Sequence, residues 1–175
     1  MKRNNLLLLL LLITTVTFIV SCKKDDIDHK NDYDKSHQSW MSFKQSSNNS
    51  YSYKTSTGSW TGTSTETLIT VKDGKVTNRS YVYKVPDKTP GGTGIVKDEW
   101  SEDQSTLNTH TAGAPTLTLD EVYQKAKTEW LLKRKDTEVF FEANNNGMIS
   151  SCGYRDNNCQ DDCFNGINIV SIVKL

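Results

Sequence analysis

The clearest candidates for chemistry in the chain are three cysteines near its C-terminus, Cys152, Cys159 and Cys163. Three thiols permit one disulfide and leave one thiol over. Cys159 and Cys163 share one polar stretch, whereas Cys152 precedes it and could meet Cys163 across the stretch. Both pairings stay open. The spacing lacks the paired C-x-x-C of zinc and redox sites, so we expect a structural disulfide and no metal.

The fourth cysteine, Cys22, follows an uncharged and mostly apolar run from Leu6 to Val20, with Lys2 and Arg3 before it. The run has the length of a signal-peptide core and is shorter than a membrane span of about 20 residues. Its end, Ile-Val-Ser-Cys, resembles the bacterial lipobox. The resemblance implies a lipoprotein signal peptide over residues 1–21. It also implies that Cys22 carries acyl chains such as palmitate, and two or three chains anchor a protein stably to a membrane.

A short charged stretch, Lys-Lys-Asp-Asp-Ile-Asp, follows Cys22. Such a composition does not favour folding, and we expect residues 22–33 to form the lipidated cysteine and a flexible tether. The stretch resembles the charged signal that directs lipoproteins to the cell surface in Bacteroidetes-type bacteria. A plain linker on a periplasm-facing lipoprotein is the alternative. The sequence thus predicts an outer-membrane lipoprotein, with surface exposure favoured.

Other residue types with catalytic potential do not form a known motif. His29, His37 and His110 are scattered, and no G-x-S-x-G nucleophile motif accompanies them. The glycine-rich segment 91–94 lacks the Lys-Ser/Thr of a phosphate-binding loop. We therefore predict no catalytic residues, no cofactor and no enzymatic activity.

Acidic and amide side chains gather around the last two cysteines, at Asp156, Asn157, Asn158, Asp161 and Asp162. Oxygen ligands of this kind suit calcium, but the spacing does not follow the EF-hand pattern. We interpret the segment as a solvated loop without a metal.

Aromatic residues offer a different kind of chemistry. Tyr51, Tyr53, Trp60, Tyr81, Tyr83 and Trp100 lie in or beside expected strands. Exposed aromatic side chains are frequent binding hot spots and also stack on sugars. The favoured interpretation is that most of them fill the core of a chain that has few Leu and Ile residues.

Length and charge restrict the function classes. The chain has 175 residues with 21 basic and 21 acidic side chains. A balanced charge excludes general electrostatic binding of nucleic acid, which needs concentrated Lys and Arg. After the leader, the length suits one domain, over residues 34–175.

The elements that would position these residues can be read from periodicity. We expect a short helix over residues 34–44, and strands at Tyr51–Tyr53 and through residues 65–85. Asp73-Gly74 predicts a two-residue hairpin turn that places Val71 opposite Val76 and Thr70 opposite Thr77. A further strand is expected at residues 95–100, with Trp100 turned inward, and an irregular segment at 101–115.

The strongest helix signal covers residues 119–135. Thr118 and Glu121 form a capping box, with Leu117 and Val122 as a hydrophobic staple. Strands follow at 138–143 and 148–154, joined by an Asn146-Gly147 turn, then a loop at 155–165 and a closing strand at 167–173 inside the sheet. The order predicts an α+β domain: an antiparallel sheet with an N-terminal helix and one longer amphipathic helix packed on it.

The order of these segments resembles a family of small secreted or lipid-anchored bacterial domains of unknown function. The resemblance rests on Trp40, Tyr-Ser-Tyr at 51–53, Val-Lys-Asp-Gly-Lys-Val at 71–76 and Thr-Leu-Asp-Glu-Val-Tyr at 118–123. It implies no catalytic residues. We expect a non-enzymatic binding domain with a protein or glycan partner. The alternatives are a protease inhibitor acting through loop 86–94 or 155–165, and an accessory glycan-binding subunit of a surface uptake complex.

Overall fold

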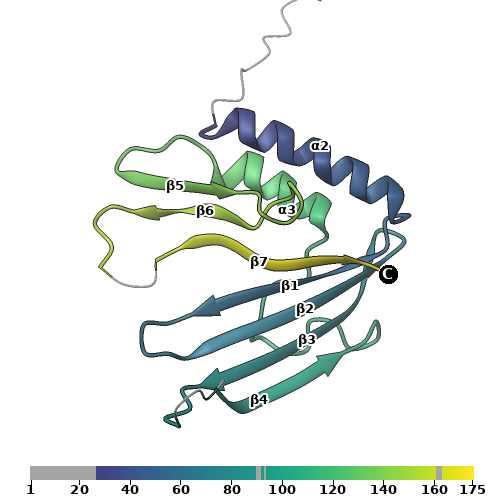
Figure 1. Ribbon diagram of the computed structural model, residues 1–175, viewed down its shortest axis with the longest axis vertical. Coiled ribbons are helices and arrows are strands. Elements are labelled where there is room, and N and C mark those ends of the chain that lie inside the picture. The colour runs from purple at the N-terminus through teal and green to yellow at the C-terminus, as the bar shows by residue number, and fades with distance from the viewer. Residues whose placement is uncertain (1–26, 90–91, 93, 161–162) are drawn as a thin grey trace, which may run out of the picture.

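The computed structural model describes residues 27–89, 92, 94–160 and 163–175. The expected signal peptide, Cys22 and the first part of the tether lie outside this range. The described chain is an α+β fold in which seven strands form one antiparallel sheet of order β4-β3-β2-β1-β7-β6-β5 (Figure 1). The predicted fold class is therefore confirmed.

The first four strands of the chain form one side of the sheet and the last three form the other side. The two groups meet where β1 pairs with β7. The strands are β1 (Tyr51–Gly58), β2 (Ser64–Lys72), β3 (Lys75–Val85), β4 (Ile95–Glu102), β5 (Thr137–Glu142), β6 (Ser151–Asp156) and β7 (Asn165–Lys174). The closing strand β7 pairs with β1 on one side and β6 on the other, as its apolar residues on both faces predicted. The sheet edges are β4 and β5.

The β2–β3 hairpin turns at Asp73 and Gly74, which both have positive φ, 49° and 76°. This conformation is the one that a two-residue hairpin turn needs, and the predicted turn is confirmed. Val71 pairs with Val76 as expected, but Thr70 pairs with Asn78 rather than Thr77. The register shifts by one residue between Thr70 and Val71, so a β-bulge corrects this detail of the prediction.

The N-terminal helix α2 (Lys30–Ser46) begins before the expected residue 34. Ile27 is buried and bridges to Leu132, and the Asp28 amide donates to the carbonyl of Leu131 over 2.8 Å. Residues 27–33 therefore belong to the folded domain, and the prediction of a flexible tether as far as residue 33 is wrong. The apolar contact of Ile27 outweighs the polar character of its neighbours.

The second helix, α3 (Leu119–Lys125), starts at the predicted capping box. The Glu121 amide donates to the Thr118 hydroxyl, and the Thr118 amide donates to the Glu121 carboxylate over 2.7 Å. The helix continues as the wider turn η2 (Ala126–Trp130) and ends there, five residues short of the prediction. Leu131 and Leu132 instead leave the helix to pack in the core and to pair with Ile27. The N-terminal helix is thus the longer one, contrary to expectation.

The turn at Asn146-Gly147 is also confirmed, since Asn145 and Met148 bridge across it. The strand expected from residue 148 begins later, at Ser151. Met148 and Ile149 are buried beforehand, and the Ile149 amide donates to the hydroxyl of Tyr123 over 3.2 Å. These residues extend the core under the helices instead of lengthening the strand.

Both helices cover the half of one sheet face that contains β1, β7, β6 and β5 (Figure 1). Trp40 of α2 is completely buried, its ring 5.2 Å from that of Tyr51 on β1. Its indole nitrogen donates to Asp120 on α3 over 2.9 Å. The Tyr51 hydroxyl in turn accepts a hydrogen bond from the Leu119 amide. The helices and the sheet therefore share one apolar core.

Candidate functional site

The other half of the same sheet face, over β2, β3 and β4, carries polar side chains. Register places Ile69, Arg79 and Glu102 in one cross-strand row, next to Tyr53 of β1. The adjacent row contains Thr55, Thr67, Tyr81 and Trp100. Because side chains alternate along a strand, all of these point to the face that the helices cover further along.

Arg79 and Glu102 form a buried, bidentate ion pair on this face. Arg79 Nε lies 2.9 Å from Glu102 Oε2, and Arg79 Nη2 lies 2.9 Å from Oε1. Their side chains are 4% and 0% exposed. The guanidinium of Arg79 holds the pKa of Glu102 well below its usual value, against the opposing effect of desolvation. Glu102 is therefore a carboxylate at neutral pH, and breaking such a pair leaves an uncompensated buried charge.

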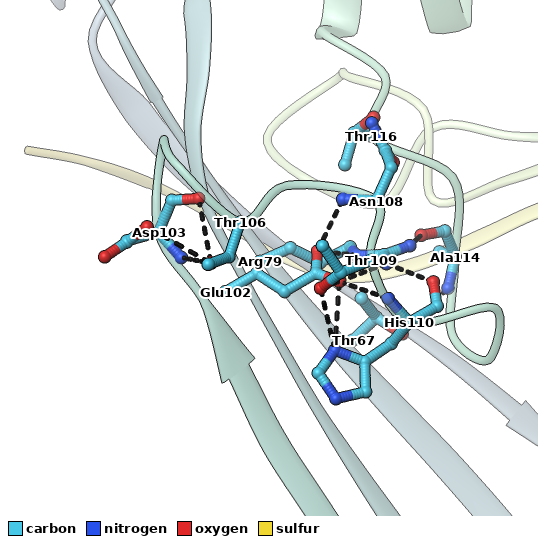
Figure 2. A network of polar contacts seen from close by, with 10 residues as sticks. All are labelled: Thr67, Arg79, Glu102, Asp103, Thr106, Asn108, Thr109, His110, Ala114 and Thr116. Carbon is cyan, nitrogen blue, oxygen red and sulfur yellow. Dashed lines mark hydrogen bonds and ion pairs between the residues drawn. The ribbon is translucent and has the colours of Figure 1, made fainter.

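The ion pair also holds the segment 103–117 against the sheet (Figure 2). Glu102 accepts the backbone amides of Asn108 over 2.9 Å and His110 over 2.7 Å. Arg79 donates to the carbonyls of His110 and Ala114, over 2.7 and 3.1 Å. A segment expected to be irregular is thus irregular in backbone but fixed by charge-assisted hydrogen bonds.

We refer to Arg79 and Glu102, with the segment 103–117 that they hold, as the clamp. His110 covers this clamp on the side that faces solvent. Its ring stacks on Trp100 with centroids 4.3 Å apart, and its Nδ1 lies 3.1 Å from Glu102 Oε1. The guanidinium carbon of Arg79 lies 4.8 Å from the centre of the Trp100 ring. Trp100 is half-buried beneath these groups, as its predicted inward orientation requires.

A cleft of about 370 Å³ lies where the two halves of the face meet. Its walls come from strands β1 to β3, from residues 113–117 of the clamped segment, from η2 and from the start of β7. The side chains that define it are those of Thr57, Thr65, Thr67, Tyr81, Trp130 and Phe164. None of the described residues that line it is charged. A cleft of this size is in the range of small-ligand sites.

Most polar side chains of the cleft carry hydroxyls, and Asn168 adds an amide. The Thr57 and Thr65 hydroxyl oxygens lie 2.6 Å apart, and the Thr67 hydroxyl accepts the Ala114 amide over 3.0 Å. Burial, with lesser effects of Asp98 and Tyr83, raises the pKa of Tyr81. Tyr81 is therefore neutral at physiological pH, and the lining stays uncharged.

The predicted cysteine chemistry is resolved into one disulfide, between Cys159 and Cys163. Cys152 is buried and forms no disulfide, so the alternative pairing with Cys163 does not occur. Burial raises the pKa of the Cys152 thiol to about 12, which makes it a poor nucleophile. The cysteines thus support structure and do not contribute to the cleft.

The remaining candidate residues are dispersed. His29 lies 3.2 Å from the Val139 carbonyl, and His37 packs against Tyr33 and Tyr123. Within the described part of the chain, no three His, Cys, Asp or Glu residues are grouped to hold a metal ion. Asp161 and Asp162 lie outside that part.

The six aromatic residues divide between core and surface. Tyr51, Tyr53 and Tyr81 are buried, Tyr83 and Trp100 are half-buried, and Trp60 is 83% exposed. The interpretation as core residues therefore holds for most of them but not for Trp60.

Sequence reasoning missed the ion pair and the cleft. One signal for the pair was present, because Arg79 alternates in step with Tyr81 and so shares its inward face. Its partner could not be found in the same way, since the strand was expected to end at Trp100, two residues before Glu102.

Comparisons with models of protein families, with curated proteins and with solved structures found no match to the chain. None of the described helices is long and apolar enough to cross a membrane.

Proposed function

We propose that this chain is a lipid-anchored, non-enzymatic binding domain of the bacterial outer membrane, whose cleft holds an uncharged ligand. The observation that carries the proposal is the cleft itself, with its neutral lining and a wall built by a clamped segment. Anchoring at Cys22 follows from the lipobox-like sequence, and the surface of the outer membrane is the favoured location.

The clamp supports a binding role because it prepares the wall before a ligand arrives. Residues 113–117 are held by Arg79 through the Ala114 carbonyl and by Thr67 through the Ala114 amide. A loop that is already ordered loses less conformational entropy when it binds. A buried ion pair adds little net stability. The role that we assign to Arg79 and Glu102 is therefore to order the wall of the cleft.

The lining favours a glycan as the ligand class. The rings of Tyr81, Trp130 and Phe164 supply flat apolar surface, and the threonines supply hydroxyls, a combination that suits the apolar faces and hydroxyl edges of neutral sugars. A charged ligand would lose its hydration in the cleft without gaining an opposite charge. The accessory glycan-binding role is therefore the version of the proposal that the cleft favours.

The protease-inhibitor hypothesis rests on loops 86–94 and 155–165, parts of which lie outside the described residues. It stays a prediction from the sequence.

The proposal can be tested with two variants on one strand. Thr65 points into the cleft and Thr70 lies on the opposite face of β2. Thr65→Trp should fill the cleft and lower affinity for a neutral oligosaccharide at least tenfold, whereas Thr70→Trp should leave it unchanged. The assay is calorimetric titration of the soluble chain, residues 23–175, with a panel of neutral oligosaccharides.

Equal binding by both variants, or no binding of any neutral oligosaccharide by the unaltered chain, would contradict the glycan proposal. Circular dichroism melting of both variants establishes that each is folded.

A further inference from the structure

Three connections between strands, and the connection from η2 to β5, lie at one end of the sheet. Gly58 pairs with Ser64, Val85 with Ile95, and Thr137 with Asp156, so these residues lie at a common end (Figure 1). The start of β7 lies there as well, because Asn165 pairs with Tyr154. We refer to this end, with the described residues 58–64, 85–89, 94–95, 132–137, 156–160 and 163–165, as the anchor end.

The N-terminal residues of the described chain are fixed to the anchor end. Ile27 is 5% exposed and bridges to Leu132, which lies on the connection between η2 and β5. Cys22 is five residues before Ile27. A fully extended chain spans at most about 3.6 Å per residue, so Cys22 lies within about 18 Å of Ile27. A lipid on Cys22 would therefore hold the anchor end close to the bilayer.

Exposed apolar side chains are present at this same end. Of the ten large apolar side chains that are exposed among the described residues, five lie on the connections or strand starts of the anchor end: Trp60, Ile95, Val96, Leu132 and Phe164. The other five, on α2, on β2 and in or directly after the second half of β7, lie away from it. Their exposed fractions run from 37% for Leu132 and Phe164 to 83% for Trp60.

Trp60 stands at the tip of the β1–β2 hairpin and is the most exposed of these side chains. The hairpin from Thr55 to Thr65 contains no charged residue. Its tip is ordered by a turn in which the Gly62 amide donates to the Ser59 carbonyl over 2.9 Å, and Gly62 has a φ of 83°. An ordered, uncharged loop that presents a tryptophan suits the interface between lipid headgroups and acyl chains, where tryptophan is enriched.

We propose that the anchor end docks on the lipid bilayer and that Trp60 enters the bilayer interface as a second contact beside the lipid on Cys22. The inference rests on the anchoring part of the proposed function. Docking would hold the domain in one orientation, with the strand ends opposite the anchor end, including Glu102 and the start of the clamped segment, turned away from the membrane.

The test uses the acylated mature chain in phosphatidylcholine vesicles made with or without brominated acyl chains. Bromine quenches tryptophan only within the bilayer. We expect brominated vesicles to quench the fluorescence of the unaltered chain, and we expect Trp60→Phe to abolish most of that quenching. Because Trp60 is exposed and makes no core contact, the substitution should leave the fold intact, and the melting temperature provides the control.

Mass spectrometry of the same sample separates the two claims. Acyl chains on Cys22 without Trp60-dependent quenching would overturn the docking inference and leave the anchoring proposal standing. A chain without acyl groups would overturn the anchoring, and with it the docking. Oligosaccharide titration of Trp60→Phe adds an independent readout, since the cleft should bind as in the unaltered chain.

Discussion

The two halves of one sheet face are covered in different ways. Over β5, β6, β7 and β1 the cover is two helices, and the contact is apolar, with Trp40, Tyr51 and Tyr123 at its centre. Over β2, β3 and β4 the cover is the segment 103–117, which has no regular secondary structure and is held by Arg79 and Glu102. The helix-covered half supplies most of the buried apolar surface. The loop-covered half supplies little of it but shapes the cleft.

The difference suggests a division of roles. Burial of apolar area is the main favourable contribution to folding, whereas a buried ion pair contributes little net stability. The chain nevertheless has this ion pair over β2, β3 and β4, where apolar side chains could cover the sheet instead. The ion pair fixes a wall beside an open cleft. We therefore expect substitutions in the helix-covered half to change mainly stability, and substitutions in the loop-covered half to change ligand binding as well.

The largest effect is expected in the helix-covered half. Trp40→Ala removes a fully buried ring and its hydrogen bond to Asp120. Replacing a buried Trp by Ala typically lowers the free energy of unfolding by about 3–5 kcal/mol. Chemical denaturation measures the change. A loss below about 1 kcal/mol would show that α2 is not essential to the core.

In the loop-covered half, Arg79→Met should act on the cleft as well as on stability. The substitution leaves Glu102 buried without its counter-charge and frees the carbonyls of His110 and Ala114. We expect the amides of Asn108 and His110 to exchange with deuterium about tenfold faster or more, since bonds to charged groups are among the stronger ones.

A double variant sharpens this prediction. Arg79→Met with Glu102→Leu removes both charges and should recover stability relative to Arg79→Met alone. Ligand binding should not recover, because the hydrogen bonds to the wall are still missing. Recovery of both would show that the pair has no role in shaping the cleft.

Acidification should weaken the loop-covered half selectively. The ordinary pKa of Glu102, about 4.5, applies in the unfolded chain, and Arg79 lowers the pKa in the folded chain. Glu102 therefore adds stability that is fully present above about pH 4.5 and is lost as the pH falls from there toward the folded-state pKa.

Melting temperatures between pH 7 and pH 3 measure this dependence. The double variant Arg79→Met/Glu102→Leu should show a shallower decline than the unaltered chain. Identical acid profiles for the two would contradict the role assigned to Glu102.

The smallest effect is expected at the helix cap. Thr118→Ala removes the hydroxyl that accepts the Glu121 amide, and loss of such a cap costs about 1 kcal/mol. Thr128→Ala, on the exposed side of η2, is the matched control and should change the denaturation midpoint little. Equal effects of the two substitutions would argue against the capping box as a stabilising feature.

The helix-covered and loop-covered halves also differ in how much of their structure could be predicted from the sequence. The helix-covered half follows largely from local patterns, since the capping box at Thr118 and the turn at Asn146 depend on adjacent residues. Two of the boundaries that differ there, at the start of α2 and the end of η2, do so because Ile27 and Leu132 pair across 105 residues, a contact that no local pattern encodes. The predicted disulfide was found, but its pairing needed the structure.

The loop-covered half was largely beyond sequence reasoning. Arg79 and Glu102 meet only because β3 and β4 pair with a register shift between Tyr83 and Lys84. The cleft requires, in addition, that residues 113–117 return across the sheet to β1. Each of these depends on tertiary contacts. Polar composition alone predicted an irregular segment at 101–115 and gave no sign that most of it is fixed to the sheet.

The most direct test of the account is a nuclear magnetic resonance titration of the soluble chain with the neutral oligosaccharide that binds best. The account predicts saturable shifts confined to the amides of the cleft, at residues 55–57, 65–67, 81, 113–114 and 116–117. It also predicts that these shifts are smaller in the Arg79→Met variant at the same ligand concentration. Shifts centred elsewhere, or cleft shifts that Arg79→Met leaves unchanged, would contradict a binding cleft shaped by the buried ion pair.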